Sequence, residues 1–375
     1  MLFSDKFLDW HQSCLGQPIR AVGKFTLWAI MFWLVVSPVV WADRAVSLAV
    51  PVGPALSSAI VPSQRRLTMA ETAADCPESM VKVPGGTFRI GADDQLPEER
   101  SAVAVAVSGF CMDTQEVTNA QFSQFVRETG YVTVAERPLS VEQFPELSDE
   151  QRRPGSVVFQ PPAAAQPVPE LSWWQWVPGA DWRHPEGPDS TIKGRETHPV
   201  VHIAFEDALA YARWIGKDLP TEAQWEFAAR GGLVDQIFSW GNTFSPKLAN
   251  TWQGQFPVHN TKADGYLGTA PVGSFPPNGY GLYDMTGNVW EWTQDWYRVG
   301  HTGKDHTTNP IASNKQDSFD PRDPGVAKHV IKGGSFLCAR NYCSRYRPAA
   351  REAQSPDTGM SHIGFRLVAA LKTNH

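Results

Sequence analysis

Two cysteines near the C-terminus, Cys338 and Cys343, are the residues of this 375-residue sequence best suited to chemistry. Their separation of five positions matches neither neighbours on a helix nor one face of a strand, so only a bent loop brings the sulfurs together. Gly333 and Gly334, just before the pair, permit such a bend. Two close sulfurs can form a structural disulfide, act as a redox dithiol or bind a soft metal ion such as Cu(I). The residue types alone leave these three uses open.

Three arginines lie close to this pair in the sequence: Arg340, Arg345 and Arg347. Positive charge stabilises a thiolate, so we expect the arginines to lower the pKa of the two thiols. A zinc site would need two further ligands, and no nearby cysteine supplies them.

Signatures of several other kinds of site are missing from the sequence. It contains no GxGxxG that opens a helix, and no GxxxxGK[ST], HExxH, CxxC or GxSxG. The segment from Asp284 lacks the D-x-D-x-D-G pattern of an EF-hand loop. His202 is a single histidine on the apolar segment 198–203, which we interpret as a short strand with a hydrogen-bonded core histidine.

The elements that must position these residues are short and capped by clear signals. We expect a helix over 120–129 capped by Thr118 or Asn119, one over 206–215 that stops at Gly216, and one that follows the cap Thr221 and ends at Gly231. Strands are predicted on both sides of the Gly85–Gly86 turn, over 103–107 and over 110–112. Residues 137–181 read as irregular, and residues 233–366 show almost no helical periodicity.

Composition indicates a loop-rich protein with an aromatic core. The sequence holds 15 Trp, 30 Gly and 30 Pro, more turn-forming residues and tryptophan than an average globular protein. The formal net charge of −6 argues against a nucleic-acid partner, because such binders are normally basic.

The N-terminal region predicts export. Residues 25–41 carry no charge and follow Arg20 and Lys24, which is typical of a secretory signal peptide with cleavage near Ala42. An uncleaved signal anchor that ties the chain to a membrane is the alternative. We therefore divide the chain into a signal peptide or anchor (1–42), a flexible linker (43–77) and one catalytic domain (78–372), located in the periplasm or another extracytoplasmic space.

The sequence from Met80 to Val368 resembles the formylglycine-generating enzymes, the sulfatase-modifying factor family. Motifs shared with the wider superfamily occur together with two that mark the oxidases, WRHPEGPDSTI and the two-cysteine loop. The motifs that carry the resemblance are WRHPEGPDSTI (182–192), HPVVHI (198–203), LPTEAQWEFAARGG (219–232), NTWQGQFPV (250–258), FPPNGYGLYDMTGNVWEWTQDW (275–296), GGSFLCARNYC (333–343) and GFR (364–366). The resemblance implies a single compact α+β domain of the C-type-lectin-like kind, with little regular secondary structure and stabilised by calcium.

The resemblance also implies a reaction. Cys338 and Cys343 would hold Cu(I), and dioxygen would oxidise the cysteine of a Cys-x-Pro-x-Arg motif in an unfolded sulfatase to formylglycine, with a thiol as reductant. It assigns further catalytic positions to Ser335, Tyr342 and Trp290. His362 stands where some members have Asn, and it would form a hydrogen bond near the oxygen site.

Two calcium sites follow from the same resemblance, with ligands of the carboxylate and carbonyl type that hard cations prefer. The first set is Asn250, Thr251, Asp264 and Tyr266, and the second is Asp284, Gly287, Val289 and Glu291. From the residues alone, Asx turns with exposed acids are the favoured explanation of these positions.

Two other functions are compatible with a related scaffold. A non-catalytic paralogue that only binds polypeptides usually lacks the cysteine pair, and an iron-dependent sulfoxide synthase would need a His-rich site and a further helical domain. Cys76 and Cys111 are the remaining cysteines of the domain and its linker, and the sequence leaves their pairing open.

Overall fold

Three helices of the computed structural model begin and end where capping chemistry predicts. Helix α2 (Asn119–Thr129) starts after Thr118, whose Oγ1 accepts a hydrogen bond from Gln121 N while its own N donates to Gln121 Oε1. Helix α3 (Phe205–Trp214) begins one residue before its predicted start. Helix α4 (Glu222–Arg230) is capped by Thr221 and ends at Gly231 in the left-handed conformation.

The structure describes residues 76–142, 145–162, 171–301 and 306–372. The predicted signal peptide and nearly all of the predicted linker therefore lie outside the described residues. In the described ranges, no helix has the length and apolar character needed to cross a membrane.

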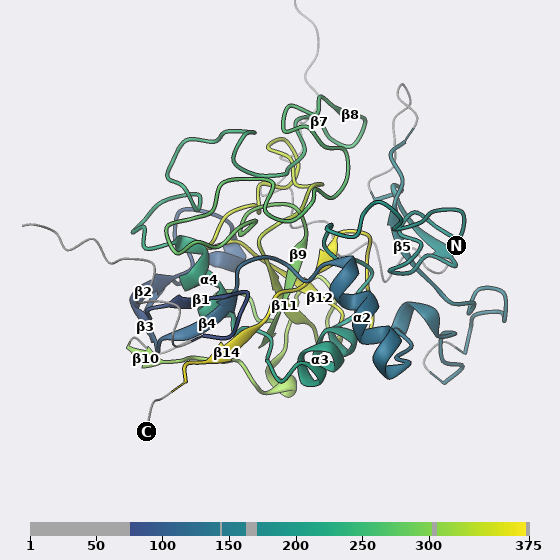
Figure 1. Ribbon diagram of the computed structural model, residues 1–375, viewed down its shortest axis with the longest axis horizontal. Coiled ribbons are helices and arrows are strands. Elements are labelled where there is room, and N and C mark those ends of the chain that lie inside the picture. The colour runs from purple at the N-terminus through teal and green to yellow at the C-terminus, as the bar shows by residue number, and fades with distance from the viewer. Residues whose placement is uncertain (1–75, 143–144, 163–170, 302–305, 373–375) are drawn as a thin grey trace, which may run out of the picture. The chain divides into compact units, whose positions relative to one another are not determined.

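A four-stranded sheet runs through the middle of the protein in the order β12-β11-β9-β13 (Figure 1). Its strands are β9 (Trp290–Trp296), β11 (His329–Lys332), β12 (Arg351–Gln354) and β13 (Ile363–Gly364). Strand β11 pairs antiparallel with β9 and β12, and β13 runs parallel to β9. Sequence patterns gave no sign of these strands, because their buried positions do not alternate with exposed ones.

Two three-stranded sheets lie beside helix α4 (Figure 1). One has the order β1-β4-β14, and the other has the order β10-β3-β2. The strands are β1 (Met80–Val83), β2 (Gly86–Ile90), β3 (Val103–Val107), β4 (Phe110–Asp113), β10 (Thr307–Thr308) and β14 (Val368–Ala370). The two strands predicted around Gly85–Gly86 therefore both exist, but they belong to different sheets.

The remaining elements are short. The segment predicted as irregular holds the hairpin β5 (Gly155–Phe159) and β6 (Trp174–Pro178), and a second hairpin joins β7 (Gly254–Gln255) to β8 (His259–Asn260). Single 3-10 turns occupy Pro97–Glu99, Val134–Glu136 and Lys315–Asp317.

The strand predicted over 198–203 is wrong. Only one isolated bridge forms there, between Pro199 and Thr118, and His202 has a φ of 61° that ends any extended run. The role predicted for His202 holds, because its fully buried ring contacts Ser156 Oγ and the Pro185 carbonyl, each at 2.8 Å.

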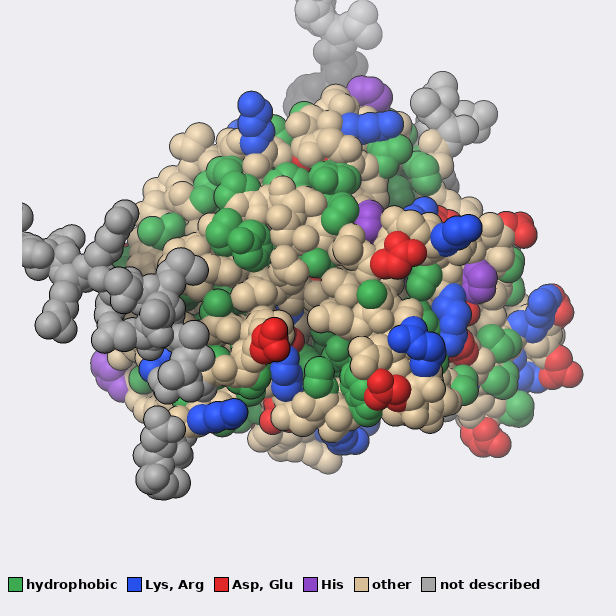
Figure 2. Space-filling view, in the orientation of Figure 1, with side chains coloured by type: hydrophobic (Ala, Val, Ile, Leu, Met, Phe, Trp, Pro, Cys, Tyr) green, Lys and Arg blue, Asp and Glu red, His purple; other side chains and the backbone are tan. Residues whose placement is uncertain are grey.

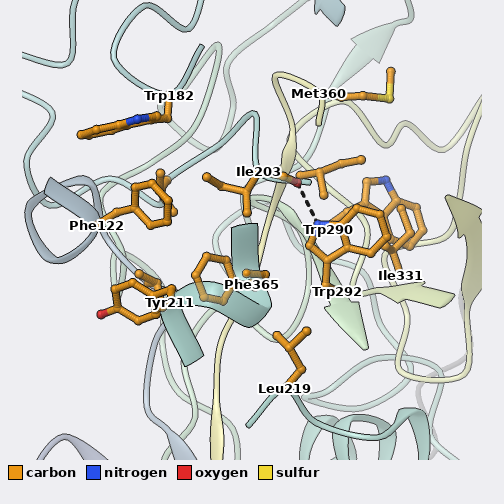
Figure 3. Close-up of a cluster of buried hydrophobic side chains, with 14 of the residues drawn as sticks. Phe122, Trp182, Ile203, Tyr211, Leu219, Trp290, Trp292, Ile331, Met360 and Phe365 are labelled. Carbon is orange, nitrogen blue, oxygen red and sulfur yellow. Dashed lines mark hydrogen bonds between the residues drawn. The ribbon is translucent and has the colours of Figure 1, made fainter. Parts of the chain in front are cut away.

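Tryptophan and other aromatic residues fill the main core, as the composition predicts (Figure 3). Trp290 and Trp292 of β9 lie in this cluster, and Trp292 Nε1 donates to the Ile203 carbonyl at 2.8 Å. On the face shown in Figure 2, basic and acidic side chains are interspersed. The protein is an α+β domain whose described residues form one compact unit with many loops.

Cys76 and Cys111 form a disulfide with an S–S distance of 2.04 Å. It ties the start of the described chain to strand β4 and answers the question that the sequence left open.

Candidate active site

One pocket collects every residue that was predicted to be catalytic. Its lining consists of Trp174, Phe256, Trp290, Ser335, Leu337, Cys338, Tyr342, Cys343, Glu352 and His362. Strand β9 provides Trp290, the hairpin β5–β6 provides Trp174, and the loop after β11 provides both cysteines. Sequence reasoning missed Trp174, Phe256, Leu337 and Glu352. The Trp173–Trp174 run was visible as an aromatic cluster, but no sequence signal pointed to Glu352.

The two thiols lie side by side in this pocket. Cys338 Sγ and Cys343 Sγ are 3.5 Å apart with no disulfide between them, and their residues are 2% and 7% exposed. Successive turns bend the loop as the spacing requires, since Cys338 N donates to the Ser335 carbonyl at 2.9 Å and Cys343 N to the Ala339 carbonyl at 2.8 Å. The Ser335 amide also approaches Cys338 Sγ at 3.4 Å. This pair of soft donors fits a soft, two-coordinate metal ion such as Cu(I).

Gly334 is needed for the bend before the pair. Its φ of 74° lies in the left-handed region, and a Cβ there would stand 2.8 Å from Tyr346 Cα. Only glycine fits this position without moving the backbone that carries Tyr346.

Arg345 lowers the pKa of the Cys338 thiol, as expected, but the net shift is in the opposite direction. Burial raises the pKa of this thiol well above its ordinary value, and the adjacent Cys343 thiol raises it further. Burial and Cys343 therefore outweigh Arg345, which also pairs with Glu98, and Arg347 pairs with Glu99. Arg340 is exposed.

Stacked rings form the walls of the pocket. Tyr342 stacks on Phe256 with ring centroids 4.3 Å apart, and His362 stacks on Trp174 at 4.7 Å. Burial lowers the pKa of His362 to about 3, so the imidazole is neutral near pH 7. The backbone also joins these walls, since Trp290 N donates to the His362 carbonyl at 2.9 Å.

The first predicted calcium set is brought together by Asp264. Its carboxylate accepts hydrogen bonds from Thr251 N and Tyr266 N, each at 3.0 Å. Asn250 is buried and donates through Nδ2 to the Gly268 carbonyl at 2.9 Å, so its Oδ1 is the atom that a cation would take. The donor set of carboxylate, amide and carbonyl oxygens fits calcium.

The second predicted calcium set lies in an acidic interior. Asp284 and Glu291 are buried with Glu116, and Arg366 is the cation that offsets them, with 2.7 Å contacts to Glu291. Burial raises the pKa of Asp284 to about 6, which shows that its charge is poorly compensated. A divalent cation among these oxygens would supply the missing charge, so the residues fit calcium.

Both oxygen-rich segments hold the cysteine loop by backbone hydrogen bonds. Gly287 N donates to the Gly333 carbonyl and Phe336 N donates to the Asn288 carbonyl, each at 2.9 Å. From the first segment, Trp252 N donates to the Cys338 carbonyl at 3.0 Å. The positions of these two segments therefore help to fix the position of the loop that carries the two thiols.

Known proteins share this sequence over most of its length. The family model of the Sulfatase-modifying factor enzyme 1-like domain matches residues 65–371. The Formylglycine-generating enzyme of Mycobacterium tuberculosis is 50% identical over 294 residues, which cover 77% of this chain and 97% of that protein. The Inactive C-alpha-formylglycine-generating enzyme 2 of Mus musculus is 38% identical over 300 residues, covering 78% of this chain and 86% of that protein.

A solved structure confirms the fold. PvdO from Pseudomonas aeruginosa aligns with a TM-score of 0.54 at 23% identity, over 78% of this chain and 94% of that chain. With the two thiols in place, the matched domain and the relatives identify this chain as a member of the sulfatase-modifying factor family.

Proposed function

We propose that this chain is a copper-dependent oxidase that converts the cysteine of a Cys-x-Pro-x-Arg motif in unfolded sulfatases to formylglycine, using dioxygen. One observation carries the proposal: two thiols that form no disulfide lie 3.5 Å apart in a pocket lined by all the predicted catalytic side chains. A relative at 50% identity carries the name Formylglycine-generating enzyme, which supports the same activity here.

In the proposed reaction, the protein's own residues bind the metal ion and orient the substrate. Cys338 and Cys343 would hold the copper ion, and the ion would supply the redox chemistry between dioxygen and the substrate cysteine. The aromatic rings of Trp174, Phe256 and Tyr342 line the pocket and would exclude water from the bound substrate. Ser335 and His362 offer polar atoms close to the two sulfurs, with His362 in its neutral form.

The overall reaction requires an external source of electrons. A cysteine side chain, one dioxygen molecule, two protons and two electrons give the aldehyde, hydrogen sulfide and water. Oxidation of two thiol groups to a disulfide supplies the two electrons and the two protons, so a thiol reductant completes the balance.

A peptide assay tests the proposal. A Cys-x-Pro-x-Arg peptide incubated with the purified protein, copper, dioxygen and dithiothreitol is expected to gain an aldehyde by mass spectrometry. Cys338→Ser and Cys343→Ser are each expected to lower the rate at least a thousandfold, because each removes a metal ligand. Ser344→Ala, an exposed neighbour in the same loop, is the matched control and should retain the wild-type rate.

The same assay decides between oxidase and binding protein. Full activity without copper or dioxygen would contradict the proposed chemistry. Binding of the peptide without aldehyde formation under any copper condition would favour a non-catalytic, polypeptide-binding role; a mouse relative is named as an inactive enzyme.

Two structural calcium ions complete the proposal. Asn250, Asp264 and the Thr251 and Tyr266 carbonyls would hold the first, and Asp284, Glu291 and the Gly287 and Val289 carbonyls the second. A calcium chelator is expected to lower the melting temperature by several degrees, since a ligand at 100 times its Kd adds about 2.7 kcal/mol. Asp264→Ala should reduce this response, and unchanged melting of the wild-type protein in chelator would contradict both sites.

We also propose that the protein is exported, with residues 1–42 as signal peptide or membrane anchor. The Cys76–Cys111 disulfide supports an oxidising compartment, because such bonds are rare in the cytosol. Fractionation of cells that produce the full chain is expected to place it outside the cytoplasm; recovery in the cytosol with both cysteines reduced would contradict the proposal.

A further inference from the structure

A buried guanidinium lies behind one of the two thiols. Arg345 is fully buried, and its Nη1 is 4.0 Å from Cys343 Sγ. This side chain is not part of the pocket lining and has no role in the reaction as written above.

Two carboxylates fix the orientation of this guanidinium. Glu98 Oε1 accepts from Arg345 Nε at 2.9 Å and also from Nη2, and Glu352 Oε2 lies 3.3 Å from Nε. Glu98 belongs to the 3-10 turn Pro97–Glu99, and Glu352 lies on β12 and lines the pocket. A planar fork held by acids from two elements has little freedom to move away from the sulfur.

We propose that Arg345 is the positioning residue of the cysteine pair, holding Cys343 Sγ next to Cys338 Sγ and supplying positive charge to the loaded metal site. This inference rests on the proposed function, because the charge matters only when the pair binds copper. Two thiolates and one Cu(I) carry a net charge of −1, and a buried net charge is costly unless a fixed opposite charge lies close to it. Arg345 is the buried cation in contact with a cysteine sulfur.

A neighbouring arginine provides a matched control. Arg347 pairs with Glu99 through two hydrogen bonds, at 2.8 and 2.5 Å, and Glu99 belongs to the same 3-10 turn as Glu98. The other hydrogen bond of Arg347 within the described residues goes to the Ser344 carbonyl, so this arginine contacts neither sulfur. Substitution of either arginine removes a buried ion pair, but only substitution of Arg345 removes a positive charge beside a thiol.

The experiment compares Cu(I) affinity and turnover in Arg345→Gln, Arg345→Lys and Arg347→Gln. Affinity is measured by competition with a chromophoric Cu(I) chelator under anaerobic conditions, and thermal melting is recorded in parallel. We expect Arg345→Gln to weaken Cu(I) binding at least tenfold, and to lower kcat at saturating copper with KM for the peptide within twofold of wild type. Arg345→Lys, which keeps the charge but loses the planar guanidinium, should weaken Cu(I) binding three- to tenfold.

Arg347→Gln is expected to lower the melting temperature while its Cu(I) affinity stays within threefold of wild type. Equal Cu(I) affinities of the Arg345→Gln and Arg347→Gln proteins would overturn the inference. If Arg345→Gln does not fold, unchanged Cu(I) affinity and kcat in Arg345→Lys would overturn it. A wild-type protein that binds Cu(I) but forms no aldehyde contradicts the proposed function and not the role of Arg345 at the metal site, whereas a wild-type protein that binds no Cu(I) contradicts both.

Discussion

At the scale of single residues, burial controls the charges of the side chains that surround the active site. His202 and His362 are kept neutral because water cannot solvate an imidazolium in the core, and burial lowers their pKa values to about 4 and about 3. The same effect raises the pKa of Cys338. In the proposed function, copper binding would remove a proton from a thiol that holds it tightly, so we predict that copper loading becomes more favourable as the pH rises.

Asp207 allows a test of burial away from the active site. Its carboxylate accepts from Ala204 N at 2.9 Å and from Val134 N and Tyr131 Oη, each at 3.0 Å, yet burial raises its pKa to about 6. A carboxyl with a higher pKa in the folded state binds more protons when folded. Its contribution to stability is therefore present below about pH 4 and lost as the pH rises to about 6.

We predict that Asp207→Asn flattens the pH dependence of stability in that window. A rise of two pKa units corresponds to about 3 kcal/mol between pH 4 and pH 7. Urea unfolding at pH 4, 5, 6 and 7 gives the unfolding free energies of wild type and variant, and the change in their difference with pH measures the contribution of Asp207. A constant difference across this range would show that Asp207 titrates normally.

At the scale of elements, segments without regular structure hold the active-site loop in place. Gly287 joins the oxygen-rich segment around Asp284 and Glu291 to this loop through the Gly333 carbonyl, and its φ is 80°. A Cβ at Gly287 would lie 2.1 Å from the carbonyl oxygen of Asn250, in the other oxygen-rich segment. One glycine therefore lets three functional segments approach each other.

We predict that Gly287→Ala lowers the free energy of unfolding by at least about 2 kcal/mol more than Gly194→Ala. Gly194 has the same φ of 80°, and a Cβ added there would meet no atom within 4 Å, so it isolates the cost of the backbone conformation. Gly287→Ala should also reduce the stabilisation by calcium. Equal destabilisation of the two variants in chemical denaturation would refute the close-approach argument.

The helices could be predicted from sequence because their signals are local. Thr118, Thr221 and Gly231 act through bonds to residues within one turn. The central sheet could not be predicted, because Glu291 and Lys332 are fully buried charges inside strands β9 and β11 and break the apolar pattern. Partners distant in sequence satisfy both: Arg366 pairs with Glu291, and Glu226 pairs with Lys332.

The candidate site was predictable only in part, for a related reason. The resemblance named the six catalytic positions that the pocket brings together. Spacing and composition gave no means to find Glu352, Phe256 or the pairing of Arg345 with Glu98, which are set by contacts up to 247 residues apart in the chain. Those contacts also explain why the sequence suggested a more positive environment for the thiols than the structure has.

At the scale of the whole molecule, the Cys76–Cys111 disulfide closes a loop with a sequence separation of 35. A cross-link of this length is expected to stabilise by about 3–4 kcal/mol, chiefly by restricting the unfolded chain. We predict that the double variant Cys76→Ser, Cys111→Ala shifts the urea midpoint down accordingly, while aldehyde formation under native conditions persists. Equal midpoints for wild type and variant would mean that the bond contributes nothing to stability.

Strand β4 sets a further condition on how this protein is made. Met112 pairs with Val368, and Asp113 N donates to the Leu367 carbonyl. One edge of β4, a strand from the first third of this sequence, is therefore paired by strand β14. During synthesis, one edge of β4 stays open until strand β14 has been made. Removal of Val368 and the residues after it would spare every proposed active-site residue, yet leave an unpaired strand edge that invites association between chains.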